Sequence, residues 1–200
     1  MKILVVSNGH KDLLTPTQAC KAIKDGIQID GAAITTIPMA DGGDGLIEVM
    51  LAGDRGSVKK VNSHDALFRE RKARLGIITK QNTAVIEIAE AAGSAVLMPH
   101  ERQTMVATSY GVGELIIASI KSGAKRIIVG LGGSIVTDCG MGMAQALGVE
   151  FIDKKGKLMK PVCNAGFNAL SLTDVADFDM EHVLPELENV EISVASDVST

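Results

Sequence analysis

The chain has 200 residues, of which 46% are hydrophobic and 22% charged, a composition typical of a folded globular protein with ample core material. The net charge of −4, the scattered Lys and Arg and an aromatic content of only 2% argue against a nucleic-acid surface and a polybasic membrane patch. Three widely spaced cysteines, Cys20, Cys139 and Cys163, indicate no disulfide framework. Together with the absence of a secretory leader and of an apolar run of ~20 residues, they favour a cytoplasmic location.

The first forty residues predict a strand, a helix and a second strand. Residues 2–7 (KILVVS) form the first strand, and Thr15-Pro16-Thr17-Gln18 is a capping box with proline at the first helical position. Residues 33–39 return as the second strand, which implies a right-handed crossover and a parallel pair. Ligands of open α/β sheets bind at the carboxyl edge, so we expect Lys11 to lie near the loop that follows the second strand.

That second loop, residues 40–45 (ADGGDG), holds two carboxylates among three glycines just before a predicted helix. Paired carboxylates beside a glycine-rich backbone suit Mg²⁺ held together with substrate phosphates, or a base that acts on a hydroxyl. The structural alternative is an Asx-turn followed by a capped helix. We favour this alternative for Asp44 and a functional role for Asp41.

Residues 55–88 lose helical periodicity and read as a meander of strands, which suggests a second lobe or an inserted sheet. Arg74 and the other charged residues of 69–74 alternate with apolar residues, a pattern typical of a solvated strand face. Glu87 and Glu90 accompany the run of residues 89–92 and mark either a helix start near a cleft or a solvated edge, and we favour the solvated edge. A helix is expected after Ser109, which can cap it, and its early glycines would allow a close approach to the backbone.

Residues 126–147 predict a buried strand, a glycine turn and the start of a helix, an arrangement that exposes N–H groups to an anion. Gly132 and Gly133 open the turn, and Ser134 and Thr137 add hydroxyls. The spacing fits neither the dinucleotide nor the P-loop motif. Asp138 falls in the first helical turn, where it either holds a metal or only caps the helix, and spacing alone slightly favours the cap.

The last third of the chain predicts a hairpin over 151–158 and a final strand over 191–195, with Asp197 just past its end. The sequence therefore predicts an α/β protein: a parallel Rossmann- or flavodoxin-like sheet with a second, mixed-sheet α/β lobe. We place residues 1–54 and 105–200 in an α/β core that binds nucleotide or phosphate. Residues 55–104 form the inserted mixed β lobe in this division.

Five segments in this order resemble the bacterial glycerate kinase family, the type-one glycerate 2-kinases: ADGGDG at 40–45, AVIEIAEAAG at 84–93, SYGVGELI at 109–116, GLGGSIVTDCGMGMAQALG at 130–148 and SVASDV at 193–198. The resemblance implies phosphoryl transfer from Mg-ATP to a hydroxyl of D-glycerate, giving 2-phosphoglycerate, with ATP and Mg²⁺ as cofactors. It also implies two interlocked α/β domains with the site between them. The expected partners are glycerate or a similar hydroxy acid and either a second copy or a missing C-terminal half.

The resemblance also suggests roles for individual residues. It implies that Asp41, Asp197 and Lys11 are catalytic, and that Asp41 and Asp138 are the metal ligands. Phosphate or nucleotide binding is expected from Gly132, Gly133, Ser134, Thr137 and Asp138. Substrate binding is expected from Lys11, Gly42, Gly43 and Asp44.

The sequence departs from the family pattern at several positions: Asn8 replaces an aspartate, Thr137 an asparagine, Cys139 a glycine and Ser196 a cysteine. Family members are also considerably longer. One alternative is therefore a catalytically impaired or truncated relative that binds phosphate-bearing ligands without turnover. A nucleotide-cofactor domain of an oxidoreductase ranks last, because the glycine spacing that it requires is missing.

Overall fold

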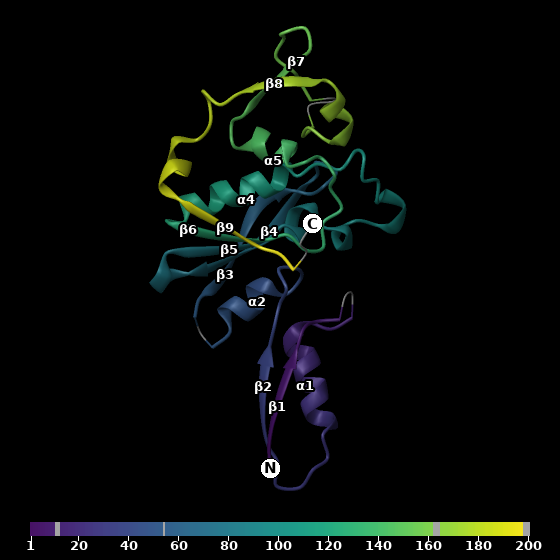
Figure 1. The fold of residues 1–200 in the computed structure, drawn as a ribbon, viewed down its shortest axis with the longest axis vertical. Helices are drawn as coiled ribbons and strands as arrows, with labels where there is room; N and C mark the ends of the chain where they lie inside the picture. The colour runs from purple at the N-terminus through teal and green to yellow at the C-terminus, as the bar shows by residue number, and fades with distance from the viewer. Residues whose placement is uncertain (11–12, 54, 162–164, 198–200) are drawn as a thin grey trace.

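The computed structural model describes residues 1–10, 13–53, 55–161 and 165–197, and it has a mixed α/β architecture (Figure 1). Strands β1 (Lys2–Ser7) and β2 (Ala33–Pro38) form a parallel pair, and helix α1 (Pro16–Gly26) packs against it. The Gln18 N–H donates to Thr15 Oγ1 at 3.3 Å, and the Thr15 N–H donates to Gln18 Oε1 at 2.9 Å. The predicted β–α–β unit and its capping box are thus confirmed.

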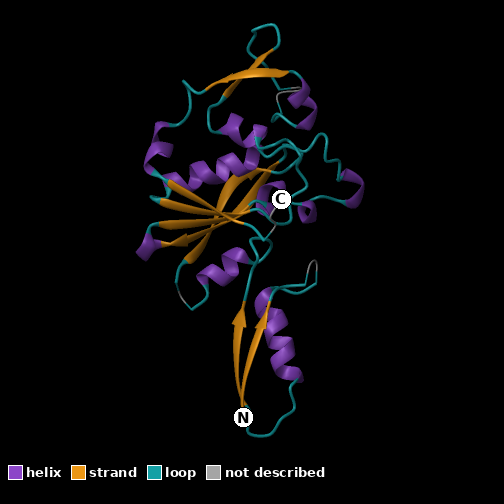
Figure 2. Ribbon diagram, viewed as in Figure 1, coloured by secondary structure: helices purple, strands orange, loops and turns teal. Residues whose placement is uncertain are grey.

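A five-stranded sheet forms the centre of the larger part of the molecule (Figure 2). Its strands are β3 (Ser57–His64), β4 (Glu70–Ile78), β5 (Thr83–Glu87), β6 (Arg126–Gly130) and β9 (Glu191–Ala195), in the order β3-β4-β5-β6-β9. The pairs from β3 to β5 are antiparallel, whereas β5, β6 and β9 run parallel. All five side chains of β5 are buried, as expected for a central strand covered on both faces.

The sheet joins strands from both regions that the sequence assigned to different lobes. β3, β4 and β5 come from residues 55–104, and β6 and β9 come from residues 105–200. Pairing of β5 with β6 over five residues carries the antiparallel meander directly into the parallel strands. The predicted domain division stays a prediction, but the meander and the later strands share one sheet.

Helices cover both faces of this sheet. Val112, Leu115 and Ile116 of α4 (Tyr110–Lys121) pack with β5 and β6 in the main core, beside the short helix α3 (Ala89–Ala92). On the other face, α2 (Leu46–Leu51) packs Leu46 and Ile47 against β4 and β5. Helix α5 (Met141–Ala146) lies against α4. The 3₁₀ turns are η1 (Thr79–Gln81), η2 (Ser94–Val96), η3 (Pro99–Glu101), η5 (Ala169–Thr173) and η6 (Pro185–Asn189). None of the helices in the described part of the chain is long and apolar enough to cross a membrane.

A separate antiparallel pair lies beyond α5 in the view of Figure 1, built from β7 (Glu150–Asp153) and β8 (Val175–Asp179). The predicted hairpin over 151–158 is confirmed: Ile152 forms an antiparallel bridge with Leu158, and the Asp153 N–H donates to the Lys157 carbonyl at 2.8 Å. The sequence did not predict that β7 also pairs along its length with β8. The partner strand comes from the segment after 160, where the hydrophobic pattern gave no signal.

Candidate active site at the junction of four loops

The loops that follow β2, β6 and β9 are bonded to one another through their main chains. The Leu131 N–H donates to the Ala195 carbonyl at 3.1 Å, and the Gly132 N–H donates to the Gly42 carbonyl at 3.0 Å. A Cβ on Gly132 would overlap Gly43 Cα, and one on Gly42 would overlap the Ala195 carbonyl. Glycine is thus required here because the backbones touch. The expectation that loops from distant parts of the chain gather at the carboxyl edge is confirmed.

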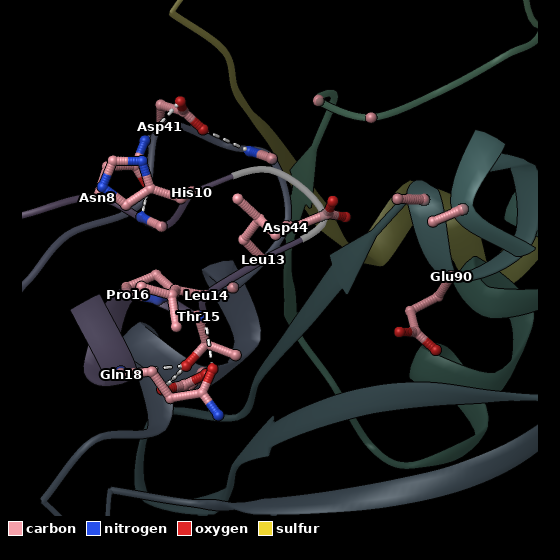
Figure 3. A pocket seen from close by; sticks show the side chains of 18 of the residues that line it. Asn8, His10, Leu13, Leu14, Thr15, Pro16, Gln18, Asp41, Asp44 and Glu90 are labelled. Carbon is pink, nitrogen blue, oxygen red and sulfur yellow. Dashed lines mark hydrogen bonds between the residues drawn. The ribbon is translucent and has the colours of Figure 1, made fainter. Parts of the chain in front are cut away.

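A cavity of about 540 Å³ opens above these loops (Figure 3). Residues of the loop after β1 and the first turn of α1 form one wall, and residues of β4 and α3 belong to another. The predicted site residues that line it are Asp41, Gly43, Asp44, Gly132, Gly133 and Asp197. The described lining does not include Gly42, Ser134, Thr137 or Asp138. Lys11 lies outside the described residues, although its neighbour His10 lines the cavity.

Asp41 is held by two donors at the cavity wall. Its Oδ2 accepts a hydrogen bond from Asn8 Nδ2 at 2.7 Å, and its Oδ1 accepts one from the Gly43 N–H at 2.9 Å (Figure 3). The Asx-turn of this loop therefore belongs to Asp41 and not, as predicted, to Asp44. The Asn8 contact joins the loop after β1 to the loop after β2. Each oxygen of Asp41 accepts one of these hydrogen bonds and has a further lone pair, which suits a carboxylate that receives a proton or a cation.

The helix that follows this loop begins without the predicted Asp44 cap. Its N-cap is Gly45, with φ of 96°, and no described side chain of its own segment caps it. Instead Glu87 Oε1, at the end of β5, accepts the Ile47 N–H at 2.7 Å. Glu87 is 1% exposed, so the prediction of a solvated edge for this residue is wrong. Burial raises the pKa of Glu87, although the Ile47 N–H bond and the charge of Arg74 act in the opposite direction.

Arg74 also lines the cavity, on a strand face that the sequence predicted to be solvated. Glu90 accepts the Arg74 backbone N–H at 2.8 Å and its Nε at 2.7 Å, while Glu87 lies 3.6 Å from a terminal nitrogen. Partial burial opposes the charge of Arg74, but the hydrogen bond and charge of Glu90 outweigh it and raise the pKa of the guanidinium. The guanidinium therefore stays charged, and Glu90 and Glu87 fix its position.

The charged side chains that line the described part of the cavity are predominantly acidic. They are five carboxylates, Asp41, Asp44, Glu48, Glu90 and Asp197, and one guanidinium, Arg74. These charges repel an anion that enters alone and attract a divalent cation, which would lessen the repulsion of phosphates that it accompanies. No group of three or more His, Cys, Asp or Glu among the described residues is arranged to hold a metal. The carboxylates of the cavity nevertheless fit Mg²⁺, because this ion commonly binds through one or two carboxylates plus substrate phosphates and water.

Asp138 lies elsewhere and is 1% exposed. Its Oδ2 accepts from the Ser109 N–H at 2.8 Å, the Ser109 hydroxyl at 2.7 Å and the Gly142 N–H at 3.1 Å. Its Oδ1 accepts from the Gly140 N–H at 3.1 Å. The carboxylate thus joins the first turns of α4 and α5, which agrees with the structural alternative of a capping aspartate. Its four donors leave it poorly suited to a metal, and it does not share the cavity with Asp41.

The glycine turn at Gly132 and Gly133 does not lead directly into a helix, contrary to the prediction from the sequence. Helix α5 begins at Met141, several residues beyond Gly133, and Asp138 accepts N–H groups at its entrance. Ser109 does not cap α4: its hydroxyl donates to Asp138 and accepts the Met143 N–H at 2.9 Å. The expected close approach at the α4 glycines is confirmed: a Cβ on Gly111 would overlap the His64 carbonyl of β3, and one on Gly113 would meet the Met143 carbonyl of α5.

The two residues predicted to offer hydroxyls make contacts within the protein, Ser134 through its main chain and Thr137 through its hydroxyl. Ser134 forms an isolated bridge with Gly93, which ties the glycine turn to the segment after α3. The Thr137 hydroxyl donates to the Thr104 carbonyl at 3.2 Å. Sequence reasoning missed Arg74 as a cavity residue, and for Glu90 the less favoured alternative, a helix start near a cleft, agrees with the structure. Glu90 follows a strand that ends at the same sheet edge, so the topology rule that found the other loops also applies to it.

Comparison with known proteins places these features in a family. The model of the glycerate kinase family matches residues 3–200. The chain is 35% identical to the glycerate 2-kinase of Escherichia coli K12 over 201 residues and 34% identical to the glycerate kinase of Bacillus subtilis 168 over 200 residues. These matches cover 100% and 99% of this chain but 51% of each relative. The chain thus spans about half the length of these relatives.

A solved crystal structure gives the same result for the fold. A protein of Salmonella typhimurium LT2, described as glycerate kinase 2, superposes with a TM-score of 0.79 at 31% identity. The match covers 100% of this chain and 53% of that one. Because the family model matches nearly the whole chain, and the fold agrees, this chain belongs to the glycerate kinase family.

Proposed function

We propose that this chain provides the catalytic cavity of a glycerate kinase, which transfers the terminal phosphoryl group of Mg-ATP to a hydroxyl of D-glycerate and gives 2-phosphoglycerate. One observation supports this most directly. Loops from both ends of the chain and from its middle meet at one cavity, which contains Asp41, Asp44, Asp197 and Arg74 beside the main chain of Gly132 and Gly133. Phosphoryl transfer needs such positioning and charge neutralisation more than covalent chemistry.

In this proposal the glycerate hydroxyl oxygen forms a bond to the terminal phosphorus of ATP, and the bond from that phosphorus to the ADP oxygen breaks. Asp41 accepts the hydroxyl proton, and Asn8 and Gly43 hold its carboxylate in place. Asp41, with one of Asp44 and Asp197, would supply carboxylate oxygens to Mg²⁺, and the bound ion would neutralise phosphate charge. Gly132 and Gly133 allow phosphates close to the backbone. Asp138 is given a structural role, because four donors already bind its oxygens.

The test follows ADP formation with D-glycerate and Mg-ATP, for the native chain and for Asp41→Asn. We expect the substitution to lower kcat by about 100-fold or more, because it removes the proton acceptor. The matched control is Asp25→Asn, which makes the same chemical change at an exposed position of α1 outside the cavity lining. Equal turnover by the native and Asp41→Asn proteins would refute the role of Asp41.

A second function is favoured by the coverage of the relatives, since the chain matches only 51% of the Escherichia coli enzyme. In this alternative the cavity binds phosphate-bearing ligands, and turnover requires sequence that the chain does not contain. Calorimetry with Mg-ATP and with D-glycerate separates the two functions. Binding that depends on Asp41, without ADP formation, supports the alternative, whereas turnover by the chain alone excludes it.

A further inference from the structure

The loop after β1 contains Asn8-Gly9, the only Asn-Gly pair in the sequence. Asn8 is exposed, and neither residue belongs to a helix or a strand. The Gly9 N–H donates to Oδ1 of the Asn8 side chain at 2.7 Å. Among the described residues, this N–H has no main-chain acceptor. The Gly9 nitrogen therefore lies against the side-chain amide of Asn8 and is not held by another part of the fold.

Packing requires glycine at position 9. A Cβ there would lie 2.9 Å from the Leu14 carbonyl oxygen, which is closer than real side chains approach. The next peptide group is fixed to the same carbonyl, because the His10 N–H donates to it at 2.9 Å. Glycine has no side chain that would hinder its own nitrogen from attacking a neighbouring amide. The fold thus retains the most reactive residue that can follow an asparagine.

We propose that Asn8 is a site of spontaneous deamidation. After losing its proton, the Gly9 nitrogen forms a bond to Cγ of Asn8, the bond from Cγ to Nδ2 breaks, and ammonia leaves. Water then opens the succinimide ring. Attack at Cγ gives aspartate with the original main chain, whereas attack at the main-chain carbonyl carbon gives isoaspartate, in which the chain runs through Cγ. One water is consumed and one ammonia is released, so the reaction needs no oxidant, cofactor or second protein.

The modification changes the wall of the cavity. Asn8 lines it, and its Nδ2 donates to Asp41 Oδ2 at 2.7 Å (Figure 3). Both products lack this amide donor and carry a carboxylate in its place. Deamidation therefore breaks the side-chain link between the loops after β1 and β2, and it adds a negative charge beside Asp41. We expect the modified protein to attract a divalent cation more strongly than the native protein does.

Incubation of the native chain at mildly alkaline pH, followed by digestion in acid and peptide mapping by mass spectrometry, tests the modification. Asn82 and Asn189 are internal controls, since both are exposed and are followed by the β-branched residues Thr83 and Val190. Asn8 should deamidate faster than either control by about tenfold or more, because a β-branched side chain crowds the attacking nitrogen. The rate should rise with pH. Survival of Asn8 for as long as both controls would overturn the proposal.

Calorimetry with Mg²⁺ alone tests the effect on the cavity, and it does not depend on the phosphoryl transfer proposed above. Asn8→Asp represents the aspartate product, and Asn8→Ser is the matched control, because it removes the amide without adding a charge. The Kd for Mg²⁺ should fall by about fivefold or more in Asn8→Asp and in deamidated protein isolated by anion exchange. In Asn8→Ser it should stay within about twofold.

Circular dichroism checks that each variant is folded, and the deamidated native protein decides the matter if Asn8→Asp does not fold. Equal Mg²⁺ affinity of the native and deamidated proteins would refute the assigned effect on the cavity. An equal gain in Asn8→Ser would refute it too, because the added charge would then not be the cause.

Discussion

Asp41 and Asp138 occupy similar positions in the sequence, each beside glycines in a loop before a short helix, and the structure uses them differently. Asp41 is exposed on a cavity wall and accepts two hydrogen bonds. Asp138 is 1% exposed and accepts four. The number of internal donors therefore separates an aspartate that can meet a ligand from one that holds two helices together. That number depends on tertiary contacts such as Ser109 to Asp138, which span 29 residues.

The largest expected effect tests this difference directly. Asp138→Ala should lower the free energy of unfolding by about 3 kcal/mol or more, because it leaves buried N–H and O–H donors without an acceptor. Asp41→Ala should lower it by less than about 1 kcal/mol, as expected for an exposed site. Urea unfolding measures both. The comparison fails if the two substitutions have equal effects on stability.

A cap on the other side of the cavity gives the next effect. Thr15→Ala should destabilise by about 1 kcal/mol, because Thr15 caps α1 and receives the Gln18 N–H. The exposed neighbour Thr17→Ala is the control, and it should change stability by no more than about 0.5 kcal/mol. Thermal or urea unfolding of the two variants tests whether α1 takes its cap locally, whereas α5 depends on the distant contacts of Asp138.

A substitution at Asn8 tests the hydrogen bond that holds Asp41. Asn8→Asp would place two carboxylates where an amide now donates to Asp41 at 2.7 Å. We expect the variant to lose stability relative to the native protein as pH rises and both carboxylates ionise. Urea midpoints measured from acid to neutral pH check this. A constant difference across the range would mean that the Asn8 contact is not kept in solution.

The smallest effect concerns Glu87, a buried carboxylate with a single N–H donor and a more distant guanidinium. Its raised pKa means that the folded protein binds the proton more tightly than the unfolded chain. Glu87 therefore reduces stability progressively as pH rises from its unfolded pKa through its raised folded pKa. Unfolding free energies of the native protein minus those of Glu87→Gln should fall over that window. A rising difference would contradict the assigned direction.

Local patterns predicted the parts of this fold that local chemistry determines. The strand of residues 2–7, the Thr15 capping box and the return strand were all readable, because alternation and capping act within a few residues. The pairing of β7 with β8 was not, since nothing near residue 153 specifies a partner that starts at Val175. Long-range strand pairing depends on which surfaces remain uncovered after the helices pack.

The candidate site divides in the same way. Topology brought Asp41, Asp197 and the glycine turn to one edge, because parallel strands end together. The hydrogen-bond and ion-pair partners of the charged side chains near the site could not be predicted from the sequence. Glu87 looks like an edge residue in sequence, yet it caps α2 from the end of β5. Arg74 and Glu90 are 16 residues apart and meet only because β4 lies beside α3.

The main-chain bonds that join the loops at Leu131, Gly132, Gly42 and Ala195 have a consequence for how this site can diversify. Its floor is made of peptide groups, which replacements at positions other than the closely packed glycines leave in place. Residues around the rim, such as Asp44, Glu48 and Arg74, can therefore be exchanged without shifting that floor. A scaffold of this kind allows ligand preference to change by rim substitutions while the backbone of the floor keeps its position.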